Sequence, residues 1–372
     1  MPSGASIPGP NRPPVLRMDR TRLLRALASQ RAYCERRSPL YASVLRELEA
    51  DAERSPAWLG RLEDAWRRRR FAVDWEAAHL LLAGMHYAAL AGEAHELASI
   101  YPSCGGRGAA PRGAARAFLA RAPGEFWERL RDGLVQTNEV GRSVAWMVAA
   151  AAAFGPRRLP FHLVELGTSA GLNLVGDHLP QACRFIAEDG AAPPAGWNRR
   201  HPILTRAGLD LRPRRIAEGH DRLWLKACVW ADDLPRLERL ELAMEVFLAM
   251  QGETRLERCS FADAPDWLLA HLQPRLGEGL LVFNSIGTVY LGDAEYEHLR
   301  RGMARALAPW RERALWVEYE RARDAPDGPL ELALHRAAAG ALRTEVIARG
   351  PPRPDRLQLR AGEPIRREPL LR

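Results

Sequence analysis

The stretch that most constrains the fold of this chain is residues 162–176, HLVELGTSAGLNLVG. Residues 161–166 form a short apolar run without a polar face, which predicts a strand buried on both sides, as in a parallel sheet. The run contains a carboxylate, Glu165, and then turns through glycines into an apolar segment predicted to be a helix. This arrangement is a common scaffold for nucleotide-like ligands, because free N–H groups at a helix start favour an electronegative group.

The polar and small residues of this stretch alternate. Glu165, Gly167, Ser169 and Gly171 form an E-x-G-x-S-x-G run. It resembles motif I of the class I S-adenosylmethionine-dependent methyltransferases, with a serine at the position of the middle glycine. The dinucleotide fingerprint G-x-G-x-x-G does not fit, because no glycine follows at the required offsets. The alternative is a glycine-rich turn that serves only close packing.

Composition narrows the class of protein. The chain has 372 residues, of which 47% are hydrophobic and 27% charged, as in ordinary globular proteins. No apolar run reaches the roughly 20 residues that span a bilayer, and residues 1–18 look like a disordered, proline-rich lead rather than a signal peptide. We therefore expect a cytoplasmic protein that does not bind membranes.

The net charge of +8 comes almost entirely from arginines interleaved with acidic residues along the chain, so a nucleic-acid partner is not favoured. The five cysteines are widely spaced and form no C-x-x-C pair, which argues against disulfides and zinc. His79 and His86 are seven residues apart, unlike helical metal ligands, so no metal site is predicted.

The order of predicted elements indicates two domains. Residues 19–155 show helical spacing and predict an all-helical domain that could cap a substrate. Residues 156–372 alternate strands and helices, which predicts a doubly wound α/β domain. Its seven strand candidates are HLVEL, LTRAGLDL, TRLERCSF, LLVFNSI, ALWVEYE, RTEVIARG and RLQLR, the last two close enough for a hairpin, and its helix candidates include PRLERLELAMEVFLAM, APDWLLAHLQ, DAEYEHLRRGMARALAPW and PLELALHRAAAGAL. This count resembles the Rossmann-like, seven-stranded methyltransferase sheet.

Ligands of such sheets bind beyond the carboxyl ends of the strands, so residues there are the candidates. Asp210 ends the second predicted strand, where a carboxylate can accept hydrogen bonds from two ribose hydroxyls. If that strand is instead CRFIAED, Glu188 or Asp189 takes the role. Asp263 follows the third strand and is a candidate for the adenine amino group, with Phe261 or Ala262 against the ring, or a helix cap. The remaining candidates for cofactor binding are Thr168, Asn173, Asn284 and Ser285.

Phrases along nearly the whole chain resemble the bacterial domain-of-unknown-function 2332 family: SPLY, HYAALAGEAHELASIYPSCGG, QTNEVGRS, VELGTSAGLNL, GLDLRP and LVFNSIGTVYL. The resemblance implies a helical N-terminal region on a methyltransferase-like C-terminal domain, without a known reaction. In QTNEVGRS, Asn138, Glu139 and Arg142 are predicted to share one helix face, either at the substrate side or as a surface ion pair. Tyr101 is a further candidate for substrate binding.

We expect an S-adenosylmethionine-dependent methyltransferase acting on a small-molecule or otherwise unidentified acceptor. Glu139, His86 and Asn284 are the candidate catalytic residues, and no metal is required, because positioning alone can drive an in-line displacement. One alternative is a binding or regulatory protein that retains the fold, favoured by Ser169. A lesser one is an α/β hydrolase with Ser169 as nucleophile, and an arginine-driven nucleic-acid enzyme is a third. The sequence does not indicate the oligomeric state.

Overall fold

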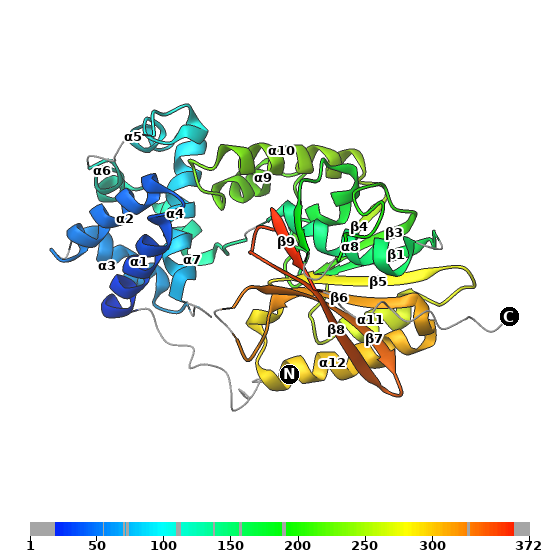
Figure 1. Cartoon of the computed structure of the whole chain (residues 1–372). Coiled ribbons are helices and arrows are strands. Elements are labelled where there is room, and N and C mark those ends of the chain that lie inside the picture. Colours follow the sequence, from blue (N-terminus) through cyan, green and yellow to red (C-terminus); the bar gives the residue numbers. More distant parts are fainter. Residues whose placement is uncertain are drawn as a thin grey trace. The chain divides into compact units, whose positions relative to one another are not determined.

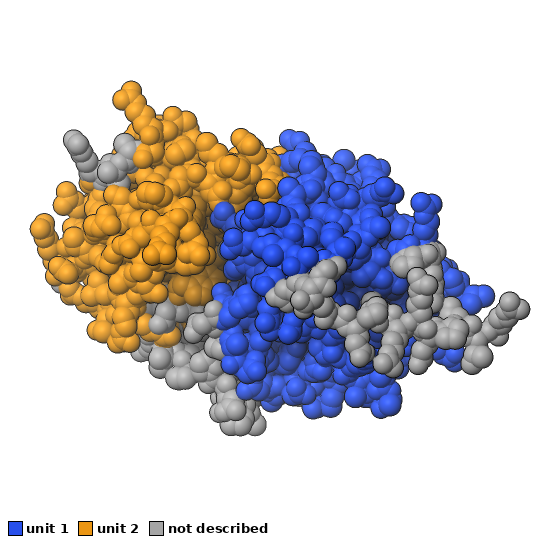
Figure 2. All heavy atoms as spheres, viewed as in Figure 1, with its two compact units in different colours: residues 1–11, 138–214, 242–372 blue, residues 12–137, 215–241 orange. Residues whose placement is uncertain are grey.

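The computed structural model describes residues 19–54, 56–69, 71, 74–108, 113–136, 138–155, 158–187, 191–325 and 328–360. The predicted lead, residues 1–18, and the alternatives Glu188 and Asp189 lie outside them. The chain divides into two compact units, coloured separately in Figure 2. We call residues 12–137 with 215–241 the helical unit, and residues 138–214 with 242–372 the α/β unit.

Some helices of the helical unit begin at a residue whose side chain caps them. Ser38, for example, accepts a hydrogen bond from the N–H of Tyr41, and Pro39 occupies the first turn of its helix. The predicted helices over 21–34, 38–53 and 74–92 are confirmed. The unit contains α1 (Arg20–Cys34), α2 (Pro39–Ala52), α3 (Ala57–Trp66), α4 (Asp74–Leu90), α5 (His95–Ala98), η1 (Pro102–Cys104), α6 (Ala114–Arg121), α7 (Gly124–Asp132) and α9 (Gly219–Ala227); α10 (Leu234–Ala249) begins in it.

The α/β unit contains one mixed sheet of nine strands in the order β2-β9-β8-β7-β6-β5-β1-β3-β4. The strands β4, β3, β1, β5 and β6 are parallel to one another, and β7, β8 and β9 continue from β6 as an antiparallel meander. Strand β2 pairs with β9 in parallel at the far edge. The strands are β1 (Phe161–Leu166), β2 (Arg184–Ala187), β3 (Ile203–Asp210), β4 (Thr254–Arg258), β5 (Gly279–Ser285), β6 (Ala314–Arg321), β7 (Leu330–Ala338), β8 (Ala341–Gly350) and β9 (Arg356–Leu359).

All seven predicted strands are present, and the last two are paired in antiparallel as expected. The two extra strands correct the sequence prediction. Residues 329–342, predicted as a helix, form β7 and the start of β8, joined at Ala339 and Gly340, which both have positive φ. Leu330, Leu332 and Leu334 are buried at a period of two, so strand pairing overrides the helix propensity of the leucines and alanines around them.

Two apolar clusters lie on the two faces of the sheet, and Figure 1 labels the helices that contribute to them. Helix α8 (Ser143–Ala153) packs in the cluster with Phe161, Leu163 and Phe283, and α11 (Ala264–His271) and α12 (Asp293–Leu307) lie with Val164 and Trp316 on the other face. The remaining short helices of the unit are η2 (Val140–Arg142), η4 (Leu172–His178), η5 (Thr288–Tyr290) and η6 (Ala308–Arg313).

The strand order reverses between β1 and β5. From β1 the chain continues to β3 and β4 on one side, then returns to β5 and β6 on the other. Such a reversal leaves a crevice outside the carboxyl ends of the two strands, which is where open α/β sheets bind ligands. We therefore build the candidate site from the β1 turn (residues 166–171) and the β5 turn (residues 284–288).

Candidate functional site

The β1 turn places three alternating residues in the left-handed region of the backbone. The φ angles are +70° at Gly167, +53° at Ser169 and +75° at Gly171. An L-residue other than glycine adopts this conformation at a cost of about 1–2 kcal/mol. Ser169 therefore keeps the conformation that a glycine would hold at the middle of the E-x-G-x-S-x-G run.

Glu165 is buried at the end of β1 and held by its own turn. Its carboxylate accepts hydrogen bonds from Thr168 Oγ1 at 2.6 Å and from Asn173 Nδ2 at 3.0 Å. Burial raises the pKa of Glu165 to about 8, although both hydrogen bonds and the nearby charge of Arg142 lower it. Among the described residues, Asn173 Oδ1 has no hydrogen-bond partner although it is buried. A buried acceptor beside Glu165 suits a ligand that carries N–H or O–H donors.

Asp210 ends β3, which pairs directly with β1, so the predicted second strand of the parallel core is in place. One of its oxygens accepts from the N–H of Ser169 at 2.8 Å, and the other accepts from the N–H of Arg212 at 2.8 Å. Each carboxylate oxygen has two lone pairs. The half-buried Asp210 thus fixes the β1 turn and retains capacity for two further donors.

Two glycines near the turn are required for packing within the protein. A Cβ atom on Gly171 would lie 2.7 Å from Phe247 and 2.8 Å from Leu256, and one on Gly208 would lie 2.6 Å from Thr168. These distances are below any normal contact. The packing alternative raised by the sequence therefore accounts for Gly171, whatever else the turn binds.

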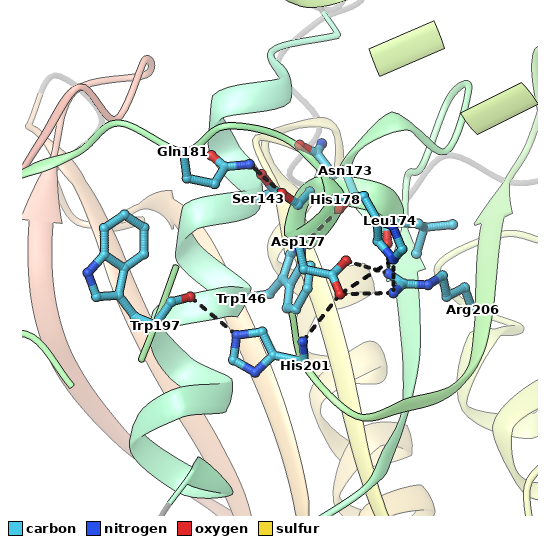
Figure 3. A network of polar contacts seen from close by, with 11 residues as sticks. Ser143, Trp146, Asn173, Leu174, Asp177, His178, Gln181, Trp197, His201 and Arg206 are labelled. Carbon is cyan, nitrogen blue, oxygen red and sulfur yellow. Dashed lines mark hydrogen bonds and ion pairs between the residues drawn. The ribbon is translucent and has the colours of Figure 1, made fainter. Parts of the chain in front are cut away.

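Helix η4 corrects the prediction of a regular helix after Gly171, because this segment has 3₁₀ form with a kink at Val175. Figure 3 shows how it is anchored to β3. The guanidinium of Arg206 forms two hydrogen bonds with the carboxylate of Asp177, at 2.8 and 3.0 Å, and also donates to the carbonyl of Leu174. Both charged side chains are buried, so this ion pair ties η4 to β3 inside the protein.

The β5 turn is built around Asn284, which is completely buried. Its Nδ2 donates to Glu318 Oε1 at 3.2 Å and to Glu320 Oε1 at 2.9 Å, and its Oδ1 accepts from Trp316 Nε1 at 2.7 Å. Its amide is thus engaged within the protein. Asn284 was a candidate for the catalytic and cofactor-binding roles, and these contacts give it a supporting one. Ser285, also predicted there, is half-buried at the end of β5.

Glu320 fixes the backbone of the β5 turn. Its Oε1 accepts from the N–H of Gly287 at 2.7 Å and of Thr288 at 3.1 Å. Burial, and then the charge of Glu318, raise the pKa of Glu320 to about 7. The preceding residue, Ile286, has a φ of +48°, which is exceptional for a β-branched residue and marks backbone strain.

Glu318 joins this turn to more distant elements. Its Oε2 accepts from Tyr296 on α12 at 2.6 Å and lies 2.9 Å from Nε2 of His335 on β7. Burial favours the neutral carboxyl, but His335, Tyr296 and Asn284 together hold the pKa of Glu318 below its usual range. The sequence prediction placed His335 in a helix, and it lies in a strand.

Asn138, Glu139 and Arg142 do not share a helix face, which corrects the prediction. Helix α8 begins at Ser143; Glu139 caps the short η2 and accepts from the N–H of Gly141, and Asn138 precedes it. All three nevertheless lie in the α/β unit. Asn138 Nδ2 donates to Ser169 Oγ at 3.2 Å, and the buried carboxylate of Glu139 lies 3.5 Å from Nε of Arg353.

The other candidates are more dispersed. Asp263 is exposed at the start of α11, where its side chain makes no capping hydrogen bond and accepts instead from Ser260 Oγ at 2.5 Å. His86 and Tyr101 belong to the helical unit. Nδ1 of His86 lies 2.9 Å from the carbonyl of Val229, so it carries the proton, and Nε2 accepts from Ser103. Both ring nitrogens are engaged, and burial lowers the pKa of His86 to about 4.

Sequence reasoning missed Glu318, Glu320 and Arg206. A signal was available for the first two. ALWVEYE is an otherwise apolar strand with two acidic residues two positions apart, and side chains at that spacing share one face of a strand. No local pattern marked Arg206, whose partner Asp177 is 29 residues earlier.

The comparisons with known proteins identify a family and no more. The model of the family described as "Uncharacterized protein conserved in bacteria (DUF2332)" matches residues 24–358. No curated protein and no solved structure matches the chain. Within the described residues, no helix is long and apolar enough to cross a membrane.

Proposed function

The chain belongs to the DUF2332 family, whose description assigns no reaction, and we propose from the site itself that its α/β unit binds S-adenosylmethionine and transfers the methyl group to an acceptor. The observation that carries the proposal is the β1 turn. Its left-handed residues at 167, 169 and 171 follow a buried carboxylate, and Asp210 holds the turn from the end of the neighbouring strand. The finer resemblance of the sheet to a methyltransferase sheet is part of this proposal.

The polar groups around the turn suit this ligand. Asp210 has lone pairs left for the two ribose hydroxyls. The unpartnered Oδ1 of Asn173 is an acceptor for an ammonium group, and Glu165 would pair with the same group once it has lost its proton. Asp263 is exposed and can accept from the adenine amino group. The cofactor-binding residues proposed are therefore Glu165, Asn173, Asp210 and Asp263, with Gly167, Thr168 and Ser169 shaping the turn.

Bound S-adenosylmethionine would supply an electrophilic methyl group, and the residues of the chain would orient its acceptor. Positioning two reactants can supply about 7–11 kcal/mol of a barrier. Asn138 lies against Ser169 on the β1 turn, and the buried Glu139 is the candidate base for an acceptor proton. We propose a substrate-binding role for Asn138, Glu139 and Arg142, all of which the α/β unit supplies.

Calorimetric titration with S-adenosylmethionine and S-adenosylhomocysteine, with NAD as a control ligand, tests the proposal. We expect micromolar binding of the two methionine derivatives only. Asp210→Asn, which replaces one acceptor oxygen with a donor, should weaken binding about tenfold or more, as the loss of a hydrogen bond with charge does. Asp266→Asn is the matched control, because Asp266 is exposed and pairs only with Arg305 on the next helix. Unchanged affinity in Asp210→Asn would refute the ribose assignment.

A Gly171 variant cannot serve this test, since any side chain there meets Phe247 and Leu256. The second candidate function is a binding or regulatory protein that retains the fold, favoured by the serine at position 169. Cofactor binding without transfer to any acceptor would support it. For the hydrolase alternative, Ser169 Oγ accepts from Asn138, and in the part of the chain that the structure describes no histidine is hydrogen-bonded to it.

A further inference from the structure

The side chain of Phe261 lies between the β1 turn and the β5 turn. A Cβ atom placed on Gly287 would be 2.8 Å from Cζ of the ring, and one placed on Gly167 would be 3.4 Å from the same atom. The tip of the ring therefore leaves no room for a side chain at Gly287, and it lies near enough to Gly167 that an added Cβ would be in ordinary contact with it. The space between them, which we call the slot, is at the reversal of strand order, where a ligand of an open α/β sheet binds. The ring occupies part of that place.

The two walls of the slot are fixed by backbone hydrogen bonds. The N–H of Gly167 donates to the carbonyl of Leu209 at 2.8 Å, and the N–H of Gly287 donates to Glu320 at 2.7 Å. Moving the Gly287 wall would break a buried hydrogen bond, which costs about 1–3 kcal/mol, and moving the Gly167 wall would break a backbone hydrogen bond at an exposed residue. The width of the slot is therefore set by the sheet and by Glu320.

Phe261 is the part that can move. It is half-buried on the connection between β4 and α11, next to the exposed Asp263. Its side chain has no polar atom, so rotating it out of the slot breaks no hydrogen bond. The walls are thus held by hydrogen bonds and the ring by apolar packing against the neighbouring core cluster, so the ring is the part of the slot that can rotate without breaking a hydrogen bond.

We propose that Phe261 is an aromatic gate, whose ring closes the slot between Gly167 and Gly287 in the free protein and leaves it when S-adenosylmethionine binds. The inference rests on the function proposed for the same site. A gate lowers the apparent affinity by the fraction of molecules that are open. If about a tenth are open, removing the ring tightens binding about tenfold. A ring that instead stacks on adenine, as the sequence suggested, would weaken binding when removed.

Stopped-flow and calorimetric measurements with S-adenosylhomocysteine on Phe261→Ala distinguish these two roles. We expect faster association and a Kd lower by about tenfold than in the wild type. Leu276→Ala is the control, because Leu276 is fully exposed just before β5, at the opposite edge of the sheet, and should leave both constants unchanged. Weaker binding by Phe261→Ala, without faster association, overturns the gate and leaves the proposed cofactor standing.

A ligand-free test asks whether the ring is in the slot at all. Gly287 has a φ of −112°, so alanine is allowed there and its only conflict is with the ring. Gly287→Ala should lower the unfolding midpoint in the wild-type background and much less in Phe261→Ala. Equal effects in both backgrounds overturn the gate. If the effects are unequal but neither the wild type nor the Phe261→Ala variant binds S-adenosylhomocysteine, the ring lies in the slot but the protein does not bind the proposed cofactor. The proposed cofactor and the gate are then both refuted.

Discussion

The β1 turn and the β5 turn follow two neighbouring strands at the reversal of strand order and share four features. Each follows a parallel strand, and each places a glycine against Phe261. Each has one residue other than glycine in the left-handed region, Ser169 in the first and Ile286 in the second. Each is also supported by a buried glutamate whose pKa burial raises, to about 8 for Glu165 and about 7 for Glu320.

The turns differ in where their support comes from. Glu165 is bonded by Thr168 and Asn173, three and eight residues away. The β5 turn is bonded by Glu320, which is 33 residues from Gly287, and its network extends to β7 and α12. The glutamate of the first turn is thus bonded within its own segment, with Asp210 of β3 as a further support of that turn, whereas the glutamate of the second turn acts across the sheet. We therefore expect local substitutions to affect the first turn and distant ones to affect the second.

The largest effect should come from the buried ion pair between Asp177 and Arg206, which ties η4 to β3. Arg206→Met leaves Asp177 buried without its charged partner, which should lower the free energy of unfolding by about 3–5 kcal/mol. Urea unfolding measures this loss. Arg255→Met on the neighbouring strand is the control, because the Arg255–Glu257 pair is exposed on its arginine side and should contribute no more than about 1 kcal/mol. Similar losses in both variants would mean that the β1 segment needs no distant support.

The second-largest effect should come from Glu320, which supports the β5 turn from β6. Glu320→Ala leaves the N–H groups of Gly287 and Thr288 and the amide of Asn284 without their acceptor, which should cost about 2–3 kcal/mol. Glu320→Gln keeps one acceptor oxygen and should cost about 1 kcal/mol. Amide hydrogen exchange should report faster exchange at Gly287 and Thr288 in the alanine variant, and unchanged exchange at Gly167. Equal protection of the β5 turn in all three proteins would contradict its dependence on β6.

A pH series tests the shared feature, the raised pKa of the two glutamates. The folded state holds protons on Glu165 and Glu320 at pH values where the unfolded chain has released them. Their contribution to stability is therefore fully present near pH 4.5 and is lost as the pH rises through about 7 and 8. Glu165→Gln should reduce the difference in unfolding free energy between pH 5 and pH 8 by on the order of 2 kcal/mol. A pH profile unchanged by that substitution would mean that Glu165 is ionised in the fold.

The difference between contacts within one segment and contacts across the sheet also determines how much of the site the sequence could predict. Glu165 and its turn lie within nine residues, so their spacing was visible, and the apolar runs around them marked the parallel strands. Asp210 was predicted because it ends a strand-like run, and the pairing of β3 with β1 places it beside the turn. The family resemblance is confirmed over residues 24–358. Sequence patterns were therefore sufficient for the features whose contacts lie within a few consecutive residues.

The remaining features depend on pairing across the sheet. Leu330 to Leu334 consist of residues that favour helices, and only pairing with β6 makes them a strand. Asn284 was expected to face the ligand, but the acidic residues that surround it come from β6, which the sequence did not connect with the site. The helix predicted over residues 136–154 begins at Ser143, since Glu139 caps η2 instead.

The smallest effect concerns the left-handed residue of the β1 turn. Ser169→Ala keeps the strained conformation and loses the hydroxyl that accepts from Asn138, so it should destabilise the protein by about 0.5–1 kcal/mol. Ser169→Gly loses the same hydrogen bond and relieves about 1–2 kcal/mol of strain, so it should be neutral or stabilising by about 0.5 kcal/mol. The difference between the two variants, measured by urea unfolding, is the cost of the serine. If the turn holds a cofactor as proposed, Ser169→Gly should also bind S-adenosylhomocysteine at least as tightly as the wild type, because it restores the middle glycine of the run. Equal stabilities for the alanine and glycine variants would show that the backbone at Ser169 is not strained. Ser169 would then differ from Ile286 in the β5 turn in this respect.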